Sequence, residues 1–298
     1  MTFFYNLRTE FPSLKVLEQE PMSAHTSFRI GGPAAMAFPA SCGELAAVYR
    51  WCLEQGQRPW LLGAGTNVLA PDAGLDRLVL CTKELSGMKD LGEGKIEAEC
   101  GVSLARLACF ARDLGLTGLE FAHGIPGTVG GGVYMNAGAY GVEMCQVAVK
   151  TTAMLPDGSL WEVEGQDHRF AYRHSVFEEK QAVVLKTVFQ LTPGDRDAIT
   201  ARMQELIEKR RSSQPLEWPS AGSTFKRPVG GYAAALIDQC GLKGKGVGKA
   251  AVSEKHAGFV INLGGATAAD VLDTMQMIRE TVQQKTGIRL EPEVRIWG

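Results

Sequence analysis

Apolar side chains recur with the 3.6-residue period of an amphipathic helix in four stretches of the chain. In the first stretch Leu45, Val48 and Tyr49 lie on one face, and polar residues occupy the other. Serine or threonine precedes three of the four stretches as an N-cap, and glycine ends the same three. The pattern predicts helices between Ser41 and Gly56, between Ser103 and Gly115, after the connector Pro193–Asp195, and between Thr267 and Gly287.

Shorter apolar runs between these helices predict β-strands. Residues 59–63 and 95–100 are two such runs, so the first half of the chain alternates strands with helices. Residues 148–191 form a β-rich stretch in which no helix is needed, with a turn at Pro156–Ser159. Residues 288–297 are expected to close the chain as a strand in which apolar and charged side chains alternate.

The composition indicates a globular protein that can bury a sizeable core. The 298 residues are 45% hydrophobic, which allows roughly two or three structural units. A net charge of -2 gives no reason to expect a nucleic-acid partner. No apolar run approaches the roughly 18 residues of a membrane span, and residues 1–10 lack a signal-peptide pattern. We therefore expect a cytoplasmic protein that binds neither nucleic acid nor a membrane.

The spacing of cysteines and histidines argues against disulfides and metal sites. The seven cysteines are scattered and include no C-x-x-C pair, so each is expected to be a small buried side chain. The five histidines show no H-E-x-x-H or other ligand spacing. We expect no bound metal.

Glycine is the compositional outlier. The chain has 35 glycines, and residues 124–141 alone hold seven of them. Such a loop would leave consecutive backbone N–H groups free to face an anion. Taken alone, it is explained equally well by tight turns or a barrel corner. A second glycine loop at residues 62–67 follows a predicted strand and adds a hydroxyl and an amide, which favours phosphate binding.

Neither glycine loop has a common nucleotide-binding pattern. The second loop lacks the third glycine of G-x-G-x-x-G, since Val68 stands there, and G-x-x-x-x-G-K-[ST] does not occur. A Rossmann domain and a P-loop are therefore disfavoured. Two separate loops could instead clamp one elongated cofactor from both sides.

Four segments further along the chain suit catalysis or anion binding. Tyr172-Arg173 offers a hydroxyl and a bidentate cation, although a snorkelling arginine at a strand end would look the same. Ser223 lies in a loop of small residues, where serine is common for reasons of turn geometry. Glu293 lies on the charged side of the terminal strand, which also fits a solvent-facing carboxylate. The basic loop 243–249 suits a diphosphate or a solvated surface.

These motifs together resemble one protein family. In chain order they are Thr26–Pro33, Leu62–Leu69, Gly124–Gly141, Tyr172-Arg173, Ala221–Lys226 and Pro292–Arg295. Their order is similar to that in the UDP-N-acetylenolpyruvoylglucosamine reductase family, and the similarity spans residues 23–298. The short run between Arg173 and Val183 resembles the shorter of the family's two subtypes. Gly258 stands where relatives often carry asparagine.

The resemblance implies an α+β fold. It comprises a two-lobed FAD-binding domain of the vanillyl-alcohol-oxidase type and a C-terminal α+β substrate domain. We expect lobe 1 at residues 1–71, lobe 2 at residues 72–194 and the substrate domain at residues 195–298. The implied cofactor is non-covalent FAD, which NADPH reduces before the enolpyruvyl substrate enters the same cleft. The implied activity converts UDP-N-acetylglucosamine enolpyruvate to UDP-N-acetylmuramate during peptidoglycan precursor synthesis, and we expect a monomer.

The resemblance also implies roles for particular residues. Arg173 would stabilise an enolate, Ser223 would donate a proton to C2 of the enolpyruvyl group, and Glu293 would assist from the other side. Substrate binding is expected at Tyr172, Lys226 and Asn262. Cofactor binding is expected at Gly63, Ala64, Gly65, Thr66, Asn67, Gly127, Thr128, Gly130, Gly131, Asn136, Gly138 and Ala139.

Two other functions fit part of the sequence. A flavin oxidase acting on an alcohol or a sugar lactone would need a histidine or cysteine tether near the phosphate loop, and His123 could supply one. A flavin-binding module without turnover would keep both glycine loops but would have no use for Arg173, Ser223 and Glu293 together.

Overall fold

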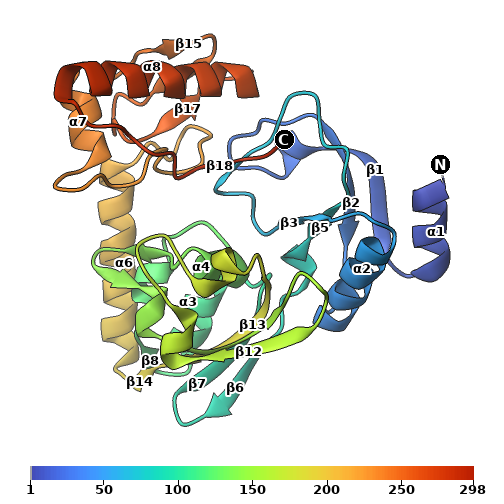
Figure 1. The fold of residues 1–298 in the computed structure, drawn as a ribbon. Helices are drawn as coiled ribbons and strands as arrows, with labels where there is room; N and C mark the ends of the chain where they lie inside the picture. The colour runs from blue at the N-terminus through green and yellow to red at the C-terminus, as the bar shows by residue number, and fades with distance from the viewer. Residues whose placement is uncertain (1) are drawn as a thin grey trace. The chain divides into compact units, whose positions relative to one another are not determined.

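The computed structural model describes residues 2–298, which form two compact units (Figure 1). The first unit contains the described part of Met1–Glu18, together with Ala35–Ala64 and Arg77–Glu208. The second contains Gln19–Ala34, Gly65–Asp76 and Lys209–Gly298. Each unit has its own cluster of buried hydrophobic residues. The predicted division at residues 71/72 and 194/195 stays a prediction.

Two larger sheets and two short strand pairs belong mainly to the first unit. One sheet has the order β1-β2-β5-β3, with parallel pairing of β5 to β2 and β3. The other is antiparallel with the order β12-β11-β13-β7-β6. The strands are β1 (Lys15–Pro21), β2 (Pro33–Phe38), β3 (Trp60–Leu62), β5 (Val79–Cys81), β6 (Met88–Gly92), β7 (Lys95–Glu99), β11 (Ala148–Met154), β12 (Leu160–Glu164) and β13 (Val183–Gln190). The short pairs are β8 (Leu116–Thr117) with β14 (Thr192–Pro193) and β9 (Gly138–Ala139) with β10 (Val142–Glu143).

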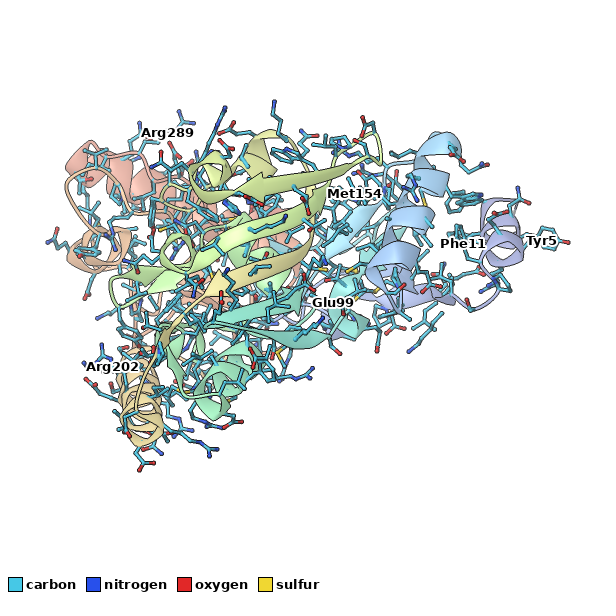
Figure 2. The ribbon with its side chains drawn as sticks, turned by 90° about the horizontal axis from the view of Figure 1, so that it is seen from below. Tyr5, Phe11, Glu99, Met154, Arg202 and Arg289 are labelled. Carbon is cyan, nitrogen blue, oxygen red and sulfur yellow. The ribbon has the colours of Figure 1, made fainter. Side chains whose placement is uncertain are left out.

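Two helices of the first unit, α2 and α3, begin at the serine caps that the sequence predicts. Ser41 accepts a hydrogen bond from the Glu44 amide at the start of α2, and Ser103 accepts one from the Arg106 amide at the start of α3. Both helices bury their predicted apolar faces, including Tyr49 and Leu107. Tyr5 instead points outward from α1 and is 72% exposed (Figure 2). The helices are α1 (Thr2–Glu10), α2 (Cys42–Glu54), α3 (Leu104–Asp113), α4 (Val129–Tyr134), α5 (Val176–Glu179) and the first part of α6 (Arg196–Ser213), with 3-10 turns η2 (Thr82–Glu84), η3 (Glu120–Ala122), η4 (Met144–Gln146) and η5 (Gly165–His168).

The second unit is built around a three-stranded antiparallel sheet with the order β15-β16-β17. Helix α8 packs on this sheet (Figure 1) and buries its predicted apolar face. Thr267 and Asp270 form the predicted capping box at its start. The elements are η1 (Met22–Ala24), β4 (Val68–Leu69), α7 (Ala233–Gln239), β15 (Gly246–Val247), β16 (Ala250–Val252), β17 (Val260–Asn262), α8 (Ala268–Thr286) and β18 (Arg295–Ile296), and β4 pairs with β18 in parallel.

Three expectations from the sequence are wrong in detail. The stretch 148–191 contains η5 and α5, because buried Val176 and Phe177 anchor a single helical turn on the core. The predicted terminal strand shrinks to Arg295–Ile296, and Ile296 is 48% exposed rather than packed with the other apolar residues. Of the seven cysteines, four are buried, two are half-buried and Cys145 is exposed.

No helix within residues 2–298 is both long enough and apolar enough to cross a lipid bilayer.

Candidate functional site

Part of the glycine run at residues 124–141 packs and hydrogen-bonds within the first unit. The Gly130 amide donates to the Cys100 carbonyl at 2.8 Å, and the Val129 amide donates to the Val102 carbonyl at 2.8 Å. A side chain on Gly130 would lie 2.8 Å from Cys100 Cβ, so this glycine permits close packing. The expectation that consecutive amides are free is therefore wrong for the α4 part of the run.

An open part of the loop remains just before α4. The amides of Gly127 and Thr128 donate to no residue in the described part of the chain, while the Thr128 hydroxyl accepts from the Gly131 amide at 3.5 Å. A Cβ on Gly63 would lie 2.5 Å from Thr128 Oγ1. The first unit therefore brings residue 63 of one predicted loop against Thr128 of the other. Two adjacent unpaired amides beside a close glycine form a cradle suited to a phosphate oxygen.

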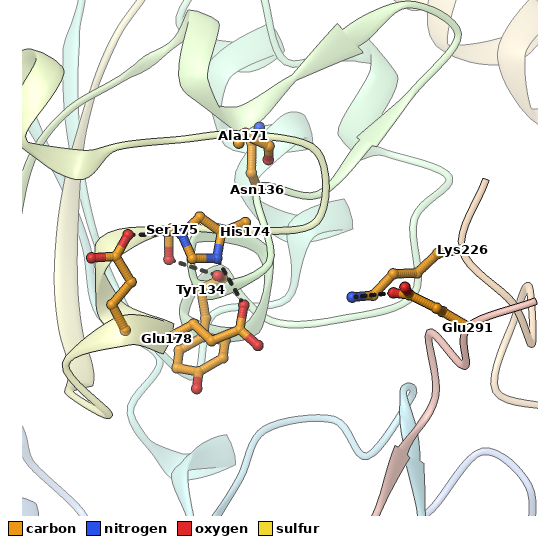
Figure 3. Close-up of polar contacts among 9 residues, drawn as sticks. Tyr134, Asn136, Ala171, His174, Ser175, Glu178, Lys226 and Glu291 are labelled. Atoms are coloured by element: carbon orange, nitrogen blue, oxygen red, sulfur yellow. Dashed lines mark hydrogen bonds and ion pairs between the residues drawn. The ribbon is translucent and has the colours of Figure 1, made fainter. Parts of the chain in front are cut away.

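Asn136 connects the glycine run to the segment that carries Arg173. Its side chain is 1% exposed and donates to Glu143 Oε2 at 2.8 Å. It also donates to the carbonyl of Ala171 at 3.1 Å, and Figure 3 shows these two residues side by side. Its Oδ1 accepts from the Cys145 amide at 2.9 Å. These bonds hold the β9–β10 hairpin and the following turn, a structural role that sequence reasoning missed. The role of Asn136, Gly138 and Ala139 in cofactor binding stays a prediction.

Arg173 lies in a tight turn closed by two hydrogen bonds between the backbones of Ala171 and His174, each 3.1 Å long. Its φ of 54° is in the left-handed region, which a non-glycine residue adopts at a cost of about 1–3 kcal/mol. The guanidinium carbon lies 5.1 Å from the centre of the Tyr172 ring, and Tyr172 is 42% exposed. A strained arginine beside an exposed tyrosine fits a ligand-binding position better than a strand end.

The turn is fixed on its C-terminal side by three contacts. Ser175 Oγ donates to the Tyr134 carbonyl at 2.7 Å (Figure 3). The His174 ring lies 3.1 Å from Glu178 Oε2 and 2.9 Å from Glu179 Oε1. These hydrogen bonds, the one to Glu179 above all, hold the pKa of His174 above its usual range.

In the second unit, the loop 65–67 supports the backbone of Glu293. Asn67 Nδ2 donates to the Glu293 carbonyl at 3.1 Å, and the Asn67 carbonyl accepts from the Arg295 amide at 3.0 Å. Gly65 has a φ of 67°, and a side chain there would collide with the His25 carbonyl. Asn67 therefore positions the terminal segment, a contact that the sequence did not reveal.

Ser223 and Glu293 lie on neighbouring segments of the second unit. The Glu293 amide donates to the Thr224 carbonyl at 2.8 Å, and the Lys226 amide donates to the Glu291 carbonyl at 2.8 Å. Ser223 is exposed next to Gly222, whose φ is 76°. The structure thus brings these two predicted catalytic residues onto paired strands of backbone, with Ser223 open to a ligand.

Two other predicted substrate residues have protein partners. Lys226 Nζ lies 3.8 Å from Glu291 Oε2 (Figure 3). Asn262 is 3% exposed, donates to the Phe28 carbonyl at 2.9 Å and accepts from the amides of Gly264 and Ala266. Asn262 is thus a structural residue in this fold, and its contact with substrate stays a prediction.

Gly258 contributes through its backbone. Its carbonyl accepts from the Thr224 amide at 2.8 Å, next to Ser223, and its amide donates to His256 Nδ1 at 3.1 Å. A Cβ at this position would lie 3.0 Å from His256 Cε1. The contacts at Gly258 therefore do not depend on a polar side chain.

Comparison with known proteins decides the family. A model of an FAD binding domain matches residues 33–164, and a model of the C-terminal domain of UDP-N-acetylenolpyruvoylglucosamine reductase matches residues 214–297. The reductase of Limosilactobacillus fermentum is 42% identical over 98% of both chains. That of Caldanaerobacter subterraneus is 44% identical over 95% of this chain and 94% of the relative.

The chain belongs to the UDP-N-acetylenolpyruvoylglucosamine reductase family. The crystal structure of such a reductase from Thermus caldophilus is similar, with a TM-score of 0.82 and 32% identity over 96% of this chain and all of the other. The predicted α+β fold and the predicted FAD cofactor are confirmed. The match of the FAD binding model includes Gly63, Gly127 and Thr128, the residues of the open cradle.

Proposed function

We propose that this chain reduces UDP-N-acetylglucosamine enolpyruvate to UDP-N-acetylmuramate with electrons from NADPH, a step of peptidoglycan precursor synthesis. The observation that carries the proposal is 42–44% identity to reductases of this name over at least 95% of the chain. The likeness covers both units, so it includes the cofactor cradle and the segments of Ser223 and Glu293.

The residues of the first unit fit a dinucleotide cofactor. We propose that the amides of Gly127 and Thr128 donate to a phosphate of FAD, and that Gly63 allows its close approach, because a side chain there would meet Thr128 Oγ1. When bound, FAD would supply hydride-transfer chemistry at C3 of the enolpyruvyl group, with NADPH as the reductant. The oxidase alternative would need a histidine or cysteine tether, which His123 could supply, and we propose instead that the flavin is held without a covalent bond.

Arg173, Ser223 and Glu293 would act on the same substrate. The Arg173 guanidinium would stabilise the negative charge that reduction at C3 leaves on the carboxylate side of the substrate, because its planar fork can donate two parallel hydrogen bonds. Ser223 donates its proton to C2, and solvent restores that proton because the side chain is exposed. An oriented donor at developing charge contributes about 2.7–4 kcal/mol, and positioned proton transfer roughly 10²–10⁴-fold.

The remaining assignments are part of the same proposal. Tyr172 and Lys226 would bind substrate, residues 1–71 and 72–194 would form the two FAD lobes, and residues 195–298 would bind the nucleotide sugar. We further propose a cytoplasmic monomer without a nucleic-acid partner, which the net charge of -2 supports.

A serine variant separates the two halves of the reaction. Ser223→Ala protein should be yellow, should be bleached by NADPH under anaerobic conditions, and should then fail to regain its colour with substrate. Ser212→Ala is the matched control, because Ser212 Oγ only donates to the Lys209 carbonyl of α6. Normal turnover in Ser223→Ala would remove Ser223 from the mechanism.

Acid precipitation of the same sample should leave the flavin in the supernatant, and flavin in the pellet would reject non-covalent binding.

A further inference from the structure

The backbone of Arg173 has a conformation that its surroundings must enforce. A non-glycine residue with a φ of 54° persists only where neighbouring contacts over-determine it. On the N-terminal side, Asn136 holds the Ala171 carbonyl. On the C-terminal side, the residue next to Arg173 is His174, whose ring bonds two carboxylates of α5.

The geometry at His174 favours a doubly protonated ring. An ionised carboxylate only accepts, so Nδ1 at 3.1 Å from Glu178 and Nε2 at 2.9 Å from Glu179 are both placed to donate. The same two contacts raise the pKa of His174, which agrees with the imidazolium form. The ring is about one-third exposed, with a side-chain exposure of 34%.

Charged groups reach His174 from its own turn and from neighbouring elements. The basic residue Arg173 is its neighbour in the chain. Glu178 and Glu179 belong to α5, and Arg169 lies 3.3 Å from Glu179. The adjacent 3-10 turn η5 contributes Asp167 and His168, and His168 bonds the Gly165 carbonyl and the Thr151 hydroxyl rather than this cluster. The α4 side contributes the Tyr134 carbonyl, which Ser175 occupies.

Helix α5 is anchored in the core, so it can hold the His174 ring in place. It has a single turn, and its first two residues, Val176 and Phe177, are buried in the core of the first unit. Glu178 and Glu179 follow directly, so their carboxylates extend from an anchored segment. A ring held by both carboxylates ties the turn of Arg173 to the core.

We propose that His174 is a positioning residue for Arg173, and that its ring, bonded to Glu178 and Glu179, holds the Arg173 turn in the conformation needed for substrate reduction. The inference rests on the proposed role of Arg173. His174 touches neither cofactor nor substrate in this proposal. Its loss should affect the step that uses Arg173 and spare reduction of the flavin by NADPH.

Four variants of the holoenzyme test the proposal. His174→Gln removes the cation and one of the two bonds, whereas His174→Lys keeps a cation that can reach both glutamates. Arg169→Gln is the matched control, because it removes the other cation of Glu179 without altering the Arg173 turn. Arg173→Lys reports on the proposed function itself.

His174→Gln should slow reoxidation of the reduced flavin by substrate about 10-fold to 100-fold, the effect of misplacing a catalytic group by an ångström or less. Reduction by NADPH should change less than about 2-fold in the same variant. His174→Lys should recover most of the rate. The raised pKa of His174 also predicts that the wild-type rate falls as pH rises through that pKa, and that this fall is absent in His174→Lys.

A structural readout accompanies the kinetics. In ¹⁵N-histidine NMR spectra, both nitrogens of His174 should stay protonated at a pH where an exposed histidine is neutral, and a neutral ring there would overturn the inference. An unimpaired His174→Gln beside an impaired Arg173→Lys would overturn it too. If Arg173→Lys is itself unimpaired, the proposed role of Arg173 fails and the inference fails with it. Thermal melting checks that each variant is folded.

Discussion

Replacing Gly63 with alanine tests the cofactor cradle, because the new Cβ has no room. It would lie 2.5 Å from Thr128 Oγ1 and 3.6 Å from Thr128 Cβ, and the first distance is well below van der Waals contact. The backbone of Gly63 does not require a positive φ, so the effect would be one of space alone. Either the loop 62–64 or Thr128 must move.

The expected magnitude follows from the crowding. Inserting one methyl group into a packed region costs about 1–3 kcal/mol. If the bound state carries this cost, the dissociation constant of FAD rises by about 5-fold to 140-fold, since 1.4 kcal/mol is a factor of ten. If the free protein already carries the strain, its melting temperature falls instead.

The assay is a titration of the apoprotein with FAD, followed by quenching of flavin fluorescence, with melting of the apoprotein measured in parallel. Gly43→Ala is the control, because a Cβ there meets only Ser41 Oγ at 3.8 Å. Thr128→Ala combined with Gly63→Ala should restore part of the affinity, as expected for residues in contact. Unchanged FAD affinity and unchanged melting in Gly63→Ala would refute the close approach of the two loops.

Two further predictions concern pH and the terminal segment. Burial holds the pKa of His168 below its usual range, so the unfolded chain takes up a proton first as pH falls through about 6.5, and stability should decline there. Melting temperatures between about pH 7.5 and 5.5 should fall less steeply in His168→Gln, and equal slopes would contradict this. Asn67→Ala should remove about 0.5–1.5 kcal/mol of stability with the hydrogen bond to the Glu293 carbonyl, and slow substrate reduction. Denaturant unfolding and steady-state rates of Asn67→Ala are compared with those of the exposed control Asn6→Ala. If both match the wild type, Asn67 does not support the Glu293 segment.

Local signals predicted much of the fold. Helices α2, α3 and α8 are capped by Ser41, Ser103 and Thr267 as expected, since N-caps and apolar periodicity are properties of the local sequence. The terminal strand was over-extended because its partners lie far away in the chain. Its pairing to β4 and to the segment of Thr224 cannot be derived from alternation alone.

For the site, the sequence did not separate residues that are open to a ligand from residues that serve the fold. Glycines mark both phosphate binding and close packing, and only the structure separates Gly130, which packs on Cys100, from Gly127, whose amide is open. Asn136 and Asn262 look like ligand residues in a motif, yet their polar atoms are used by the protein. The left-handed conformation of Arg173 has no sequence signal, because arginine rarely adopts it and the contact of Asn136 with the Ala171 carbonyl comes from a distant part of the chain.

The central claim is that one flavin passes electrons from NADPH to the enolpyruvyl sugar. Anaerobic mixing of the purified protein with one equivalent of NADPH should bleach the flavin absorbance, and addition of UDP-N-acetylglucosamine enolpyruvate should restore it. One UDP-N-acetylmuramate should form per flavin reoxidised. A flavin that NADPH reduces and the enolpyruvyl sugar leaves reduced would contradict the account.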